Sequence, residues 1–419
     1  MEDLLYLTHR IPYPPNKGDK VRSYHFLKHL SERYRVHLGT FVDDEDDWRH
    51  VDTVRALCHE TRFVRLAPRA AKLKSLRGFL SGQPLTLPYY RDGGMKRWVD
   101  DILDRLPVRH ILVFSSAMAQ YAMQASGARR VADFVDVDSD KWNQYARTRS
   151  WPLSAVYRRE GRLLLDFERE AARVFDATVF VSAAEAGWFR RLAPESAGKV
   201  FHVNNGVDFE YFSPDRDYPN PYREGEKALV FTGAMDYWPN VDAVEWFAHE
   251  IFPAIRASRP DARFYIVGAR PAPQVLKLAE LPGVAVTGSV PDIRPYLAHA
   301  ALAVAPLRLA RGVQNKVLEA MAMGKTVVAS PQAAEGIDAV DGREIRLAGG
   351  AAEWADAVCQ TLSAFAPEMG AAGRARVVAD YGWDSNLAKL DALLAADAQN
   401  IPGEAALAHC PPRKMERVA

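Results

Sequence analysis

Short runs of apolar and β-branched residues alternate with helix-length amphipathic segments along almost the whole chain. The run Leu4–Thr8, for example, is followed by the segment Asp19–Tyr34, in which apolar residues recur with helical spacing. Strands that alternate with helices in this way form parallel sheets with helices on both faces, so the pattern predicts an α/β protein. The other strands that it predicts are Val36–Val42, Arg62–Leu66, His110–Phe114, Val131–Val135, Ala177–Val181, Lys199–Val203, Ala228–Thr232, Arg263–Val267, Val284–Thr287, Ala301–Ala305 and Thr326–Ala329.

The alternation is interrupted once, and the interruption divides the chain into two halves. Asn204–Asp208 and the Pro- and Asp-rich stretch Ser213–Glu226 have the composition of a linker, after which the pattern restarts. A chain of 419 residues is long enough for two or three domains, and we expect two doubly wound, Rossmann-like domains. The predicted parts are an N-terminal domain over 1–212, a linker over 213–226, a C-terminal domain over 227–380, a helix over 381–399 and a flexible tail over 400–419.

Charge and cysteine content exclude several classes of protein. The chain has 54 basic and 53 acidic residues, so its net charge of +1 creates no global field that would recruit nucleic acid. Cys58, Cys359 and Cys410 lack metal-ligand spacing, which favours a reducing compartment over a disulfide framework or a zinc site. The N-terminus has no targeting segment, and no stretch approaches the ~20 apolar residues of a membrane span. We expect a cytoplasmic protein.

One local stretch departs from this balanced charge. Residues 62–80 contain six cations and no acid, spaced among leucines and Phe79. A basic amphipathic stretch of this kind is suited to the inner face of the cytoplasmic membrane. The alternative is a solvated face at the rim of a cleft or a loop that faces phosphate. The sequence leaves peripheral membrane association and this alternative both open.

The segment 311–330 carries the strongest functional signal. It contains a turn, a short amphipathic helix with Lys316 and Glu319 near its start, a stop at Gly324 and a β-branched strand. A helix N-terminus offers unpaired N–H groups and partial positive charge to a phosphate, Lys316 adds a cation, and Glu319 can accept hydrogen bonds from sugar hydroxyls. The alternative is an ordinary solvated ion pair, but the apolar residues around the pair leave little of this helix for solvent. The segment therefore favours a nucleotide-sugar site.

Two further groups are candidates for chemistry. Asp136, Asp138 and Asp140 follow a predicted strand, where alternating acids suit a Mg²⁺ or Mn²⁺ site, but we favour Ser139 or Asp140 as a helix cap and Asp136 as a contact to the acceptor. His9 ends the first strand and is expected either to line the cleft or to make a structural hydrogen bond. For the segment after Gly233 we expect Asn240 to cap a helix and Trp238 to pack.

Ligands of open α/β sheets bind outside the carboxyl ends of the strands. Two such domains that face one another would bring their strand ends to a common cleft, and we expect the function to lie there. The loops that this rule brings together are Arg10–Lys20, Asp136–Asp140, Thr232–Asn240 and Leu307–Asn315.

An ordered set of motifs resembles the GT-B glycosyltransferases of family 4, also called group 1. The motifs are Asn205-Gly206-Val207-Asp208, Phe231-Thr232-Gly233, Ile266-Val267-Gly268, Gly288-Ser289-Val290-Pro291-Asp292, Ala305-Pro306 and Glu319-Ala320-Met321-Ala322-Met323-Gly324. More narrowly, Pro12-Tyr13-Pro14-Pro15-Asn16-Lys17-Gly18-Asp19, Asp136-Val137-Asp138-Ser139-Asp140-Lys141-Trp142 and Gln314-Asn315-Lys316-Val317-Leu318-Glu319 resemble the sugar transferases of bacterial exosortase (PEP-CTERM) exopolysaccharide loci. The resemblance extends from about residue 2 to residue 395 and is strongest over 204–330.

The resemblance implies the GT-B fold, with C-terminal helices packing back toward the N-terminal domain, and retaining transfer of a sugar from a nucleotide diphosphate to a hydroxyl. It implies a nucleotide sugar as substrate, and we expect a lipid-linked or growing exopolysaccharide acceptor. No metal is required if the helix near Val313, Lys316 and one or both of Arg308 and Arg311 neutralise the diphosphate, so we expect neither a metal nor a cofactor. The residues that it places at the donor are Gly18, Gly268, Val290, Val313, Gln314, Asn315 and Glu319, to which we add Gly233 and Lys316. It places Asp136 after the strand that carries a catalytic residue in relatives, and we expect Asp138 and His9 as further catalytic candidates.

The chain departs from the family at one position. Relatives usually carry a second Glu eight residues before the ribose-binding Glu, where this chain has Arg311, with Arg308 nearby. Either arginine is suited to a diphosphate or a carboxylate-bearing sugar, so the donor sugar is not implied. The alternatives to a transferase are a nucleotide-sugar epimerase and a non-catalytic nucleotide-sugar-binding component of a polysaccharide assembly complex. A dehydrogenase is disfavoured, because no Gly-x-Gly-x-x-Gly follows the first strand.

Overall fold

The computed structural model describes residues 1–15, 18–310, 313–364 and 367–396. The chain forms two compact units, of which the first comprises Met1–Asn204 together with the chain from Asp384 onward, and the second comprises Asn205–Trp383. Asn205–Phe212 thus belong to the second unit, although composition suggested a boundary at residue 212. The reason is that Val207 pairs with Gly382 and that its N–H donates to the carbonyl of Tyr381 (2.8 Å), within the second unit. The predicted tail lies outside the described residues.

The first unit is built on a seven-stranded parallel sheet in the order β3-β2-β1-β4-β5-β6-β7. Its strands are β1 (Glu2–Thr8), β2 (Tyr34–Val42), β3 (Glu60–Arg65), β4 (His110–Phe114), β5 (Arg129–Val135), β6 (Ala177–Phe180) and β7 (Val200–His202). Its helices are α1 (Gly18–Ser31), η1 (Glu45–His50), α2 (Val51–Arg55), α3 (Pro68–Ser75), α4 (Arg77–Ser81), α5 (Thr86–Tyr89), α6 (Gly93–Arg105), η2 (Ser116–Tyr121), α7 (Asp138–Thr148), α8 (Leu153–Val174), α9 (Ala183–Leu192), η3 (Pro194–Lys199) and α18 (Trp383–Ala395).

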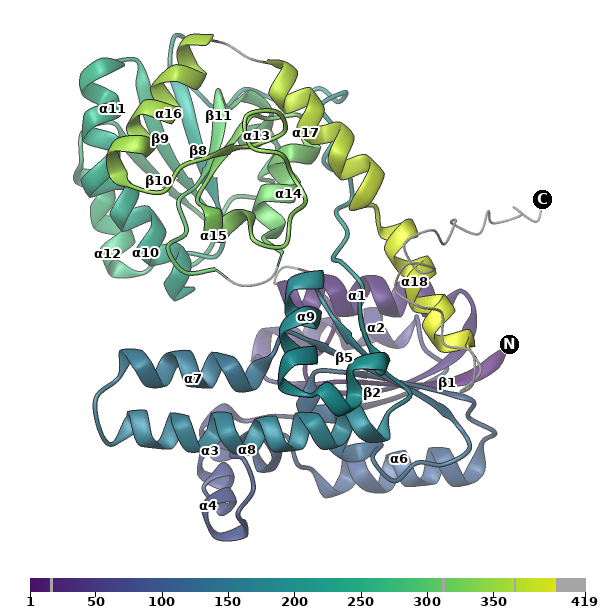
Figure 1. Ribbon diagram of the computed structural model, residues 1–419. Helices are drawn as coiled ribbons and strands as arrows, with labels where there is room; N and C mark the ends of the chain where they lie inside the picture. Colours follow the sequence, from purple (N-terminus) through teal and green to yellow (C-terminus); the bar gives the residue numbers. More distant parts are fainter. Residues whose placement is uncertain (16–17, 311–312, 365–366, 397–419) are drawn as a thin grey trace, which may run out of the picture. The chain divides into compact units, whose positions relative to one another are not determined.

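The second unit is built on a six-stranded parallel sheet in the order β10-β9-β8-β11-β12-β13. Its strands are β8 (Lys227–Thr232), β9 (Ala262–Val267), β10 (Val284–Gly288), β11 (Leu302–Ala305), β12 (Val327–Ala329) and β13 (Arg346–Leu347). Its helices are α10 (Trp238–Trp246), η4 (Phe247–Ile251), α11 (Phe252–Ser258), α12 (Pro273–Lys277), η5 (Leu278–Glu280), α13 (Arg294–His299), α14 (Asn315–Ala322), α15 (Pro331–Ala334), α16 (Ala351–Ala364) and α17 (Pro367–Asp380). Helices cover both faces of each sheet (Figure 1), so the predicted α/β class with two Rossmann-like domains is confirmed.

Each sheet is doubly wound and therefore has a switch point, where the chain crosses from one half of the sheet to the other. In the first unit this point lies between β1 and β4, and in the second unit it lies between β8 and β11. Loops on opposite sides of the switch point separate and leave room for a ligand at the edge where the strands end. We call this edge the carboxyl edge of each sheet. The order of the strands thus indicates where each unit is able to bind a ligand.

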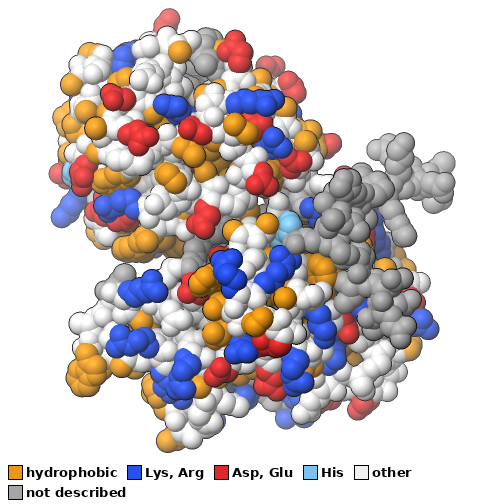
Figure 2. Space-filling model, viewed as in Figure 1, with side chains coloured by type: hydrophobic (Ala, Val, Ile, Leu, Met, Phe, Trp, Pro, Cys, Tyr) orange, Lys and Arg blue, Asp and Glu red, His pale blue; other side chains and the backbone are white. Residues whose placement is uncertain are grey.

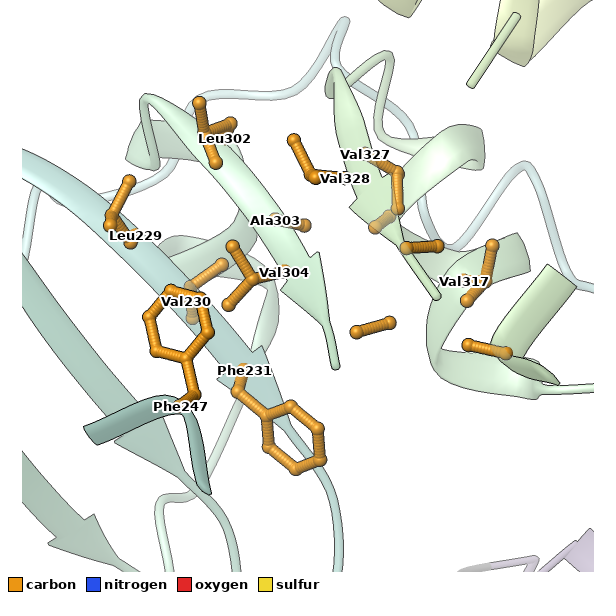
Figure 3. Close-up of a cluster of buried hydrophobic side chains, with 14 of the residues drawn as sticks. Leu229, Val230, Phe231, Phe247, Leu302, Ala303, Val304, Val317, Val327 and Val328 are labelled. Atoms are coloured by element: carbon orange, nitrogen blue, oxygen red, sulfur yellow. The ribbon is translucent and has the colours of Figure 1, made fainter. Parts of the chain in front are cut away.

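The core of the second unit holds the helix that follows the switch point. Val317 of α14 is 1% exposed and lies in one cluster with β8, β11 and β12, and Figure 3 shows it facing the strands. Leu318, Met321 and Ala322 are also fully buried, as the apolar spacing of this helix predicts. Since one side of α14 is fixed against the sheet in this way, the remaining side, which carries Lys316 and Glu319, is held in a set orientation.

Helix α18 belongs to the first unit although it follows the second unit in sequence. The Nε2 atom of His29, on α1, lies 2.8 Å from a carboxylate oxygen of Asp391, and Arg129 Nε donates to the carbonyl of Leu393 (2.7 Å). Leu390, Leu393 and Leu394 are buried as well. The helix predicted over 381–399 overlaps α18, which packs in the first unit, whereas the two preceding helices, α16 and α17, belong to the second unit.

Candidate functional site

Two glycines after neighbouring strands make the closest backbone approach at the carboxyl edge of the second unit. Gly233 follows β8 and Gly268 follows β9, and a Cβ atom on Gly268 would lie only 1.7 Å from the Gly233 carbonyl oxygen. The Gly233 N–H donates to the carbonyl of Val267 (3.1 Å), and the Gly268 N–H donates to that of Gly288 (3.3 Å). The two loops pass so close to each other that only glycine fits at both positions. As a result, backbone atoms and no side chains of these two residues lie beside the switch point.

Lys316 projects from the start of α14 toward the same place. Its Nζ atom donates to the side-chain oxygen of Asn240 and lies 4.7 Å from the centre of the Phe231 ring, at the end of β8. A Cβ atom on Gly233 would lie 3.6 Å from the Lys316 side chain. Burial lowers the pKa of Lys316 to about 8, and the Glu319 carboxylate opposes the shift only in part. A partly desolvated ammonium group at a switch point is a suitable partner for a phosphate.

Glu319 lies one helical turn after Lys316 on the same side of α14. Its side chain is half-buried and, within the part of the chain that the structure describes, makes no side-chain hydrogen bond. Burial raises the pKa of Glu319 to about 7, against the opposing charge of Lys316. A carboxyl group that is desolvated without a hydrogen-bond donor is costly unless a ligand supplies that donor. The hydroxyls of a sugar are donors of this kind.

The other predicted donor residues surround this pair in different ways. Gln314 is the N-cap residue of α14, and the side chain of Asn315 accepts a hydrogen bond from Asn205 Nδ2 (3.4 Å). Val313 is buried, whereas Val290 is half-buried in the loop that follows β10. All four lie near the carboxyl edge of the second unit. Gly18 is the first residue of α1 in the other unit, where a Cβ atom would meet nothing within 4 Å.

Arg308, unlike Lys316, already has an acidic partner in its own unit. It follows β11, forms a bidentate pair with Asp242 of α10 (Nε–Oδ2 3.0 Å) and lies over the Trp246 ring (5.4 Å). Arg270 and Arg294 at the same edge are likewise paired, with Asp236 and Asp292 respectively. Arg311, at the position where the chain departs from the family, lies outside the described residues.

Asn240 takes a different role from the one predicted. The helix α10 begins at Trp238, so Asn240 lies within its first turn and does not cap it. Its Nδ2 atom donates to the carbonyl of Ala234 (2.8 Å), while its oxygen accepts from Lys316. The prediction that Trp238 packs was also wrong, because this side chain is 58% exposed. Asn240 thus connects the loop after β8 to Lys316, a role that the sequence indicates only by an amide near the end of the strand.

In the first unit, His9 lies at the switch point between β1 and β4. Its ring stacks on Phe114 of β4 at 5.8 Å, and its Nε2 atom is 3.5 Å from a carboxylate oxygen of Asp19. Burial alone would raise the pKa of Asp19, but the hydrogen bond from His9 and the charge of Arg10 hold that pKa well below its usual range. The His9 Nδ1 atom is buried and makes no hydrogen bond to any described residue. His9 is therefore oriented by a carboxylate, as an imidazole that moves protons requires.

Asp136 and Asp138 follow β5 at the same edge and share one cation. Lys141 Nζ lies 2.8 Å from Asp136 and 3.0 Å from Asp138. Burial opposes the charge of Lys141, but the two carboxylates together raise its pKa well above the usual value. In the described ranges, no group of three or more His, Cys, Asp or Glu side chains is placed to hold a metal ion.

Two buried carboxyl groups hold the loop that carries these aspartates. Glu185 of α9 accepts from the Val137 N–H (2.8 Å), and Glu168 of α8 accepts from the N–H of Ser139 (3.2 Å) and from its hydroxyl (2.6 Å). The predicted cap by Ser139 or Asp140 was therefore wrong. The helix α7 begins at Asp138, and Glu168 of the next helix satisfies the N–H of Ser139 instead. No local sequence signal identified Glu168 or Glu185 for this role.

The backbone at the start of this loop is strained. Val135 has φ +70°, which costs a β-branched residue roughly 1–3 kcal/mol. The buried carboxylate of Asp133 compensates, since it accepts from the Val135 N–H (3.2 Å) and pairs with Arg22 Nε (2.6 Å), and Arg22 in turn donates to the carbonyl of Val203 (2.7 Å). This conformation directs the chain so that Asp136 and Asp138 emerge at the carboxyl edge.

Comparison with known proteins gives a family for part of the chain and a fold for nearly all of it. Residues 226–364 match the family model described as glycosyl transferases group 1. The sucrose-phosphate synthase of Thermosynechococcus elongatus matches with 16% identity over 94% of this chain and 98% of its own, at a TM-score of 0.67. HepE of Anabaena, solved with UDP and glucose, gives 15% identity, 93% and 98% coverage, and a TM-score of 0.65.

A third similar structure is WaaG, a glycosyltransferase involved in lipopolysaccharide biosynthesis, with 15% identity over 94% of this chain and all of its own, at a TM-score of 0.64. No curated protein sequence matches the chain significantly. At these identities the structures establish the GT-B fold alone. Residues 226–364, which hold Gly233, Gly268, Lys316 and Glu319, accordingly match the glycosyl transferases group 1 model within a chain of GT-B fold.

Proposed function

We propose that the protein is a glycosyltransferase that moves a hexose from a nucleoside-diphosphate donor to a hydroxyl acceptor in the cytoplasm. One observation carries the proposal: Lys316 and Glu319 lie beside the closely passing loops of Gly233 and Gly268 at the switch point of the group 1 domain. This arrangement offers a cation for phosphate, a carboxylate for hydroxyls and open backbone for close approach. The complex of HepE with UDP-glucose supports a donor of the UDP-hexose type.

The chemistry follows from the charges that develop when a glycosyl–phosphate bond breaks. The leaving diphosphate gains negative charge, and Lys316 together with the first N–H groups of α14 is placed to stabilise it. Removing one preorganised donor of this kind typically lowers the rate roughly 10²–10³-fold. Asn240 holds the Lys316 ammonium group in position before the donor binds, so less reorganisation is needed during the reaction.

We assign the acceptor to the carboxyl edge of the first unit, with Asp136, Asp138 and His9 as the groups nearest to the transferred sugar. We further propose retention of configuration, a lipid-linked or growing exopolysaccharide acceptor, and transfer without a metal. The pairing of Asp136 and Asp138 with Lys141 supports the last of these, because the two carboxylates already have a cation between them.

The proposal is tested by incubating the purified protein with a panel of UDP- and GDP-sugars and a polyprenyl-phosphate-linked acceptor. Nucleotide release and glycosylated product are measured in parallel. We expect one donor to give both in equal amounts. Interconversion of the donor without transfer would instead indicate an epimerase, and tight binding of a donor with no turnover would indicate a non-catalytic component.

Variants connect the activity to the site. Lys316→Met and Glu319→Gln are each expected to lower turnover at least about 100-fold. Lys277→Met is the matched control, because Lys277 is an exposed lysine on α12 of the same unit. Turnover that is equal in Lys316→Met, Glu319→Gln and the control would remove this site from the proposal.

A further inference from the structure

Exposed hydrophobic side chains are concentrated on two neighbouring segments of the first unit. Of the fifteen large hydrophobic side chains that are exposed in the described residues, six lie in one of two places. Four belong to α3, to α4 or to the residue between these helices, and two belong to the α7–α8 turn or to the first residue of α8. They are Leu73, Leu76, Phe79, Leu80, Trp151 and Leu153. Leu80 is 92% exposed and Trp151 is 81% exposed. Large apolar side chains are usually less exposed than this on a surface that contacts only water.

The same two segments carry positive charge without any acid. Residues 66–84 contain four cations and no Asp or Glu, and residues 142–159 contain four cations and no Asp or Glu. The exposed cations are Arg69, Lys72, Arg77, Arg147, Arg149 and Arg158. Figure 2 shows Lys and Arg side chains between the hydrophobic ends of α4 and of the α7–α8 turn. The protein as a whole is nearly neutral, so this distribution of charge is local.

The two segments are joined into one rigid surface by contacts with α8. Arg159 donates to the carbonyl of Gly78 (2.8 Å) and lies over the Phe79 ring (4.9 Å), so that one arginine holds α4. The next residue, Glu160, is buried and accepts from the N–H groups of Leu85 (2.5 Å) and Thr86 (2.9 Å). The Arg159 bond thus fixes α4 to the first half of α8, and the Glu160 bonds fix the start of α5, the next helix. Trp151 lies two residues before α8, and Leu153 is the first residue of that helix.

We propose that this surface, formed by α3, α4 and the α7–α8 turn, docks on a membrane that contains anionic lipids. Cations that alternate with protruding leucine and tryptophan side chains fit the two layers of such a membrane. The phosphate headgroups attract the ammonium and guanidinium groups, and the apolar side chains reach the acyl boundary below. The inference goes beyond the proposed transfer reaction, because lipid binding requires none of the residues of the donor site.

The test is co-sedimentation of the full chain with vesicles in the absence of any nucleotide sugar. Vesicles of phosphatidylcholine are compared with vesicles that also contain phosphatidylglycerol, at low and at high salt. We expect binding only to the anionic vesicles and weaker binding at high salt, where exposed charges are screened. Lys72→Ser/Arg77→Ser is expected to weaken binding roughly 30-fold at low salt, since each basic residue contributes about a fivefold effect.

Leu80→Ser and Trp151→Ser test the apolar part and are each expected to weaken binding at least about tenfold at either salt concentration. Arg173→Ser and Leu276→Ser, on exposed residues outside the proposed surface, are the matched controls and are expected to bind like the wild type. A thermal unfolding transition like that of the wild type confirms that each variant is folded. A wild-type protein that stays in the supernatant with anionic vesicles, or surface variants that bind like the controls, would overturn the proposal.

Discussion

The carbonyl oxygen of Gly233 lies where a Cβ atom of residue 268 would have to be, 1.7 Å from the ideal position of that atom. The contact joins the loops that follow β8 and β9, two strands that are parallel neighbours over their whole length. The Lys316 side chain approaches the same loop, 3.6 Å from the Cβ position of Gly233. The backbone geometry of Gly233 and Gly268 therefore determines how much space lies beside the Lys316 ammonium group.

Gly268→Ala is expected to destabilise the protein by roughly 2–4 kcal/mol, because backbone must move and the residue has φ +157°. Thermal unfolding measures this effect. Gly288→Ala is the matched control at the same edge, since it has φ +69° but nothing within 4 Å of its Cβ position, and we expect a loss of only about 1–2 kcal/mol. Equal losses in the two variants would show that the contact with Gly233 has no effect of its own.

Lys316 and Glu319 are expected to bind different parts of a nucleotide, and calorimetry with uridine and UDP separates the two. Lys316→Met should weaken the binding of UDP by roughly 1–3 kcal/mol and leave the binding of uridine unchanged, because uridine has no phosphate. Glu319→Gln should weaken both ligands by roughly 1–3 kcal/mol, because both contain the ribose hydroxyls. A loss of uridine affinity in Lys316→Met would contradict the assignment of Lys316 to phosphate.

The pH dependence of UDP binding follows from the two shifted pKa values. Glu319, with a pKa of about 7, accepts hydroxyl hydrogen bonds best as a carboxylate, so affinity should rise as the pH increases through 7. Lys316, with a pKa of about 8, loses its charge above that pH, so affinity should then fall. We expect the tightest binding between about pH 7 and pH 8.

Glu319→Gln is the control for the acidic limb of this profile, because glutamine does not titrate. The variant should keep the alkaline loss of affinity, which should begin at a lower pH because the Glu319 charge no longer supports Lys316, while the rise near pH 7 becomes smaller. An acidic limb of unchanged size in the variant would assign that limb to the phosphate of UDP and not to Glu319.

Much of the fold could be predicted from the sequence, because it depends on patterns that are local. The predicted strands Leu4–Thr8 and His110–Phe114, for example, agree with β1 and β4. Strand β13 was missed, because it contains only Arg346 and Leu347 and is therefore too short to show the alternation of apolar and polar residues that is typical of a strand.

The partners of the site residues were harder to predict than their positions. The rule for parallel sheets places Gly233, Gly268 and Lys316 at one edge without knowledge of any side-chain contact. The bond from Lys316 to Asn240 and the pair of Arg308 with Asp242 join residues that are 76 and 66 positions apart. Such contacts depend on how α10 and α14 pack, and no local pattern encodes that packing.

Transfer is expected to continue in the presence of EDTA, because Lys316 and α14 supply positive charge at the diphosphate and Lys141 separates Asp136 from Asp138. Product formation is measured with and without the chelator at a saturating donor concentration. Complete loss of activity in EDTA, restored by Mn²⁺, would contradict metal-independent transfer and would indicate that the aspartates bind a cation after all.

The buried carboxyl of Glu168 is expected to make stability depend on pH. Burial raises its pKa to about 8, with a further contribution from the Asp138 charge, whereas an unfolded glutamate has a pKa of 4.5. The folded state therefore holds this proton more tightly, so the contribution to stability is fully present below pH 4.5 and is lost as the pH rises through 8. Glutamine keeps an acceptor for Ser139 and never ionises, so Glu168→Gln should gain melting temperature relative to the wild type between about pH 5 and pH 8.

Thermal unfolding of the wild type and Glu168→Gln over this range measures the difference, with Glu170→Gln, on an exposed residue of the same helix, as the matched control. We expect the difference for Glu168→Gln to grow with pH up to about 8 and then to stay constant, while that of the control remains near zero. Since Glu168 holds the N–H and hydroxyl of Ser139, a constant difference at every pH would mean that this carboxyl stays ionised, and that α7 begins on a charged cap instead of a neutral one.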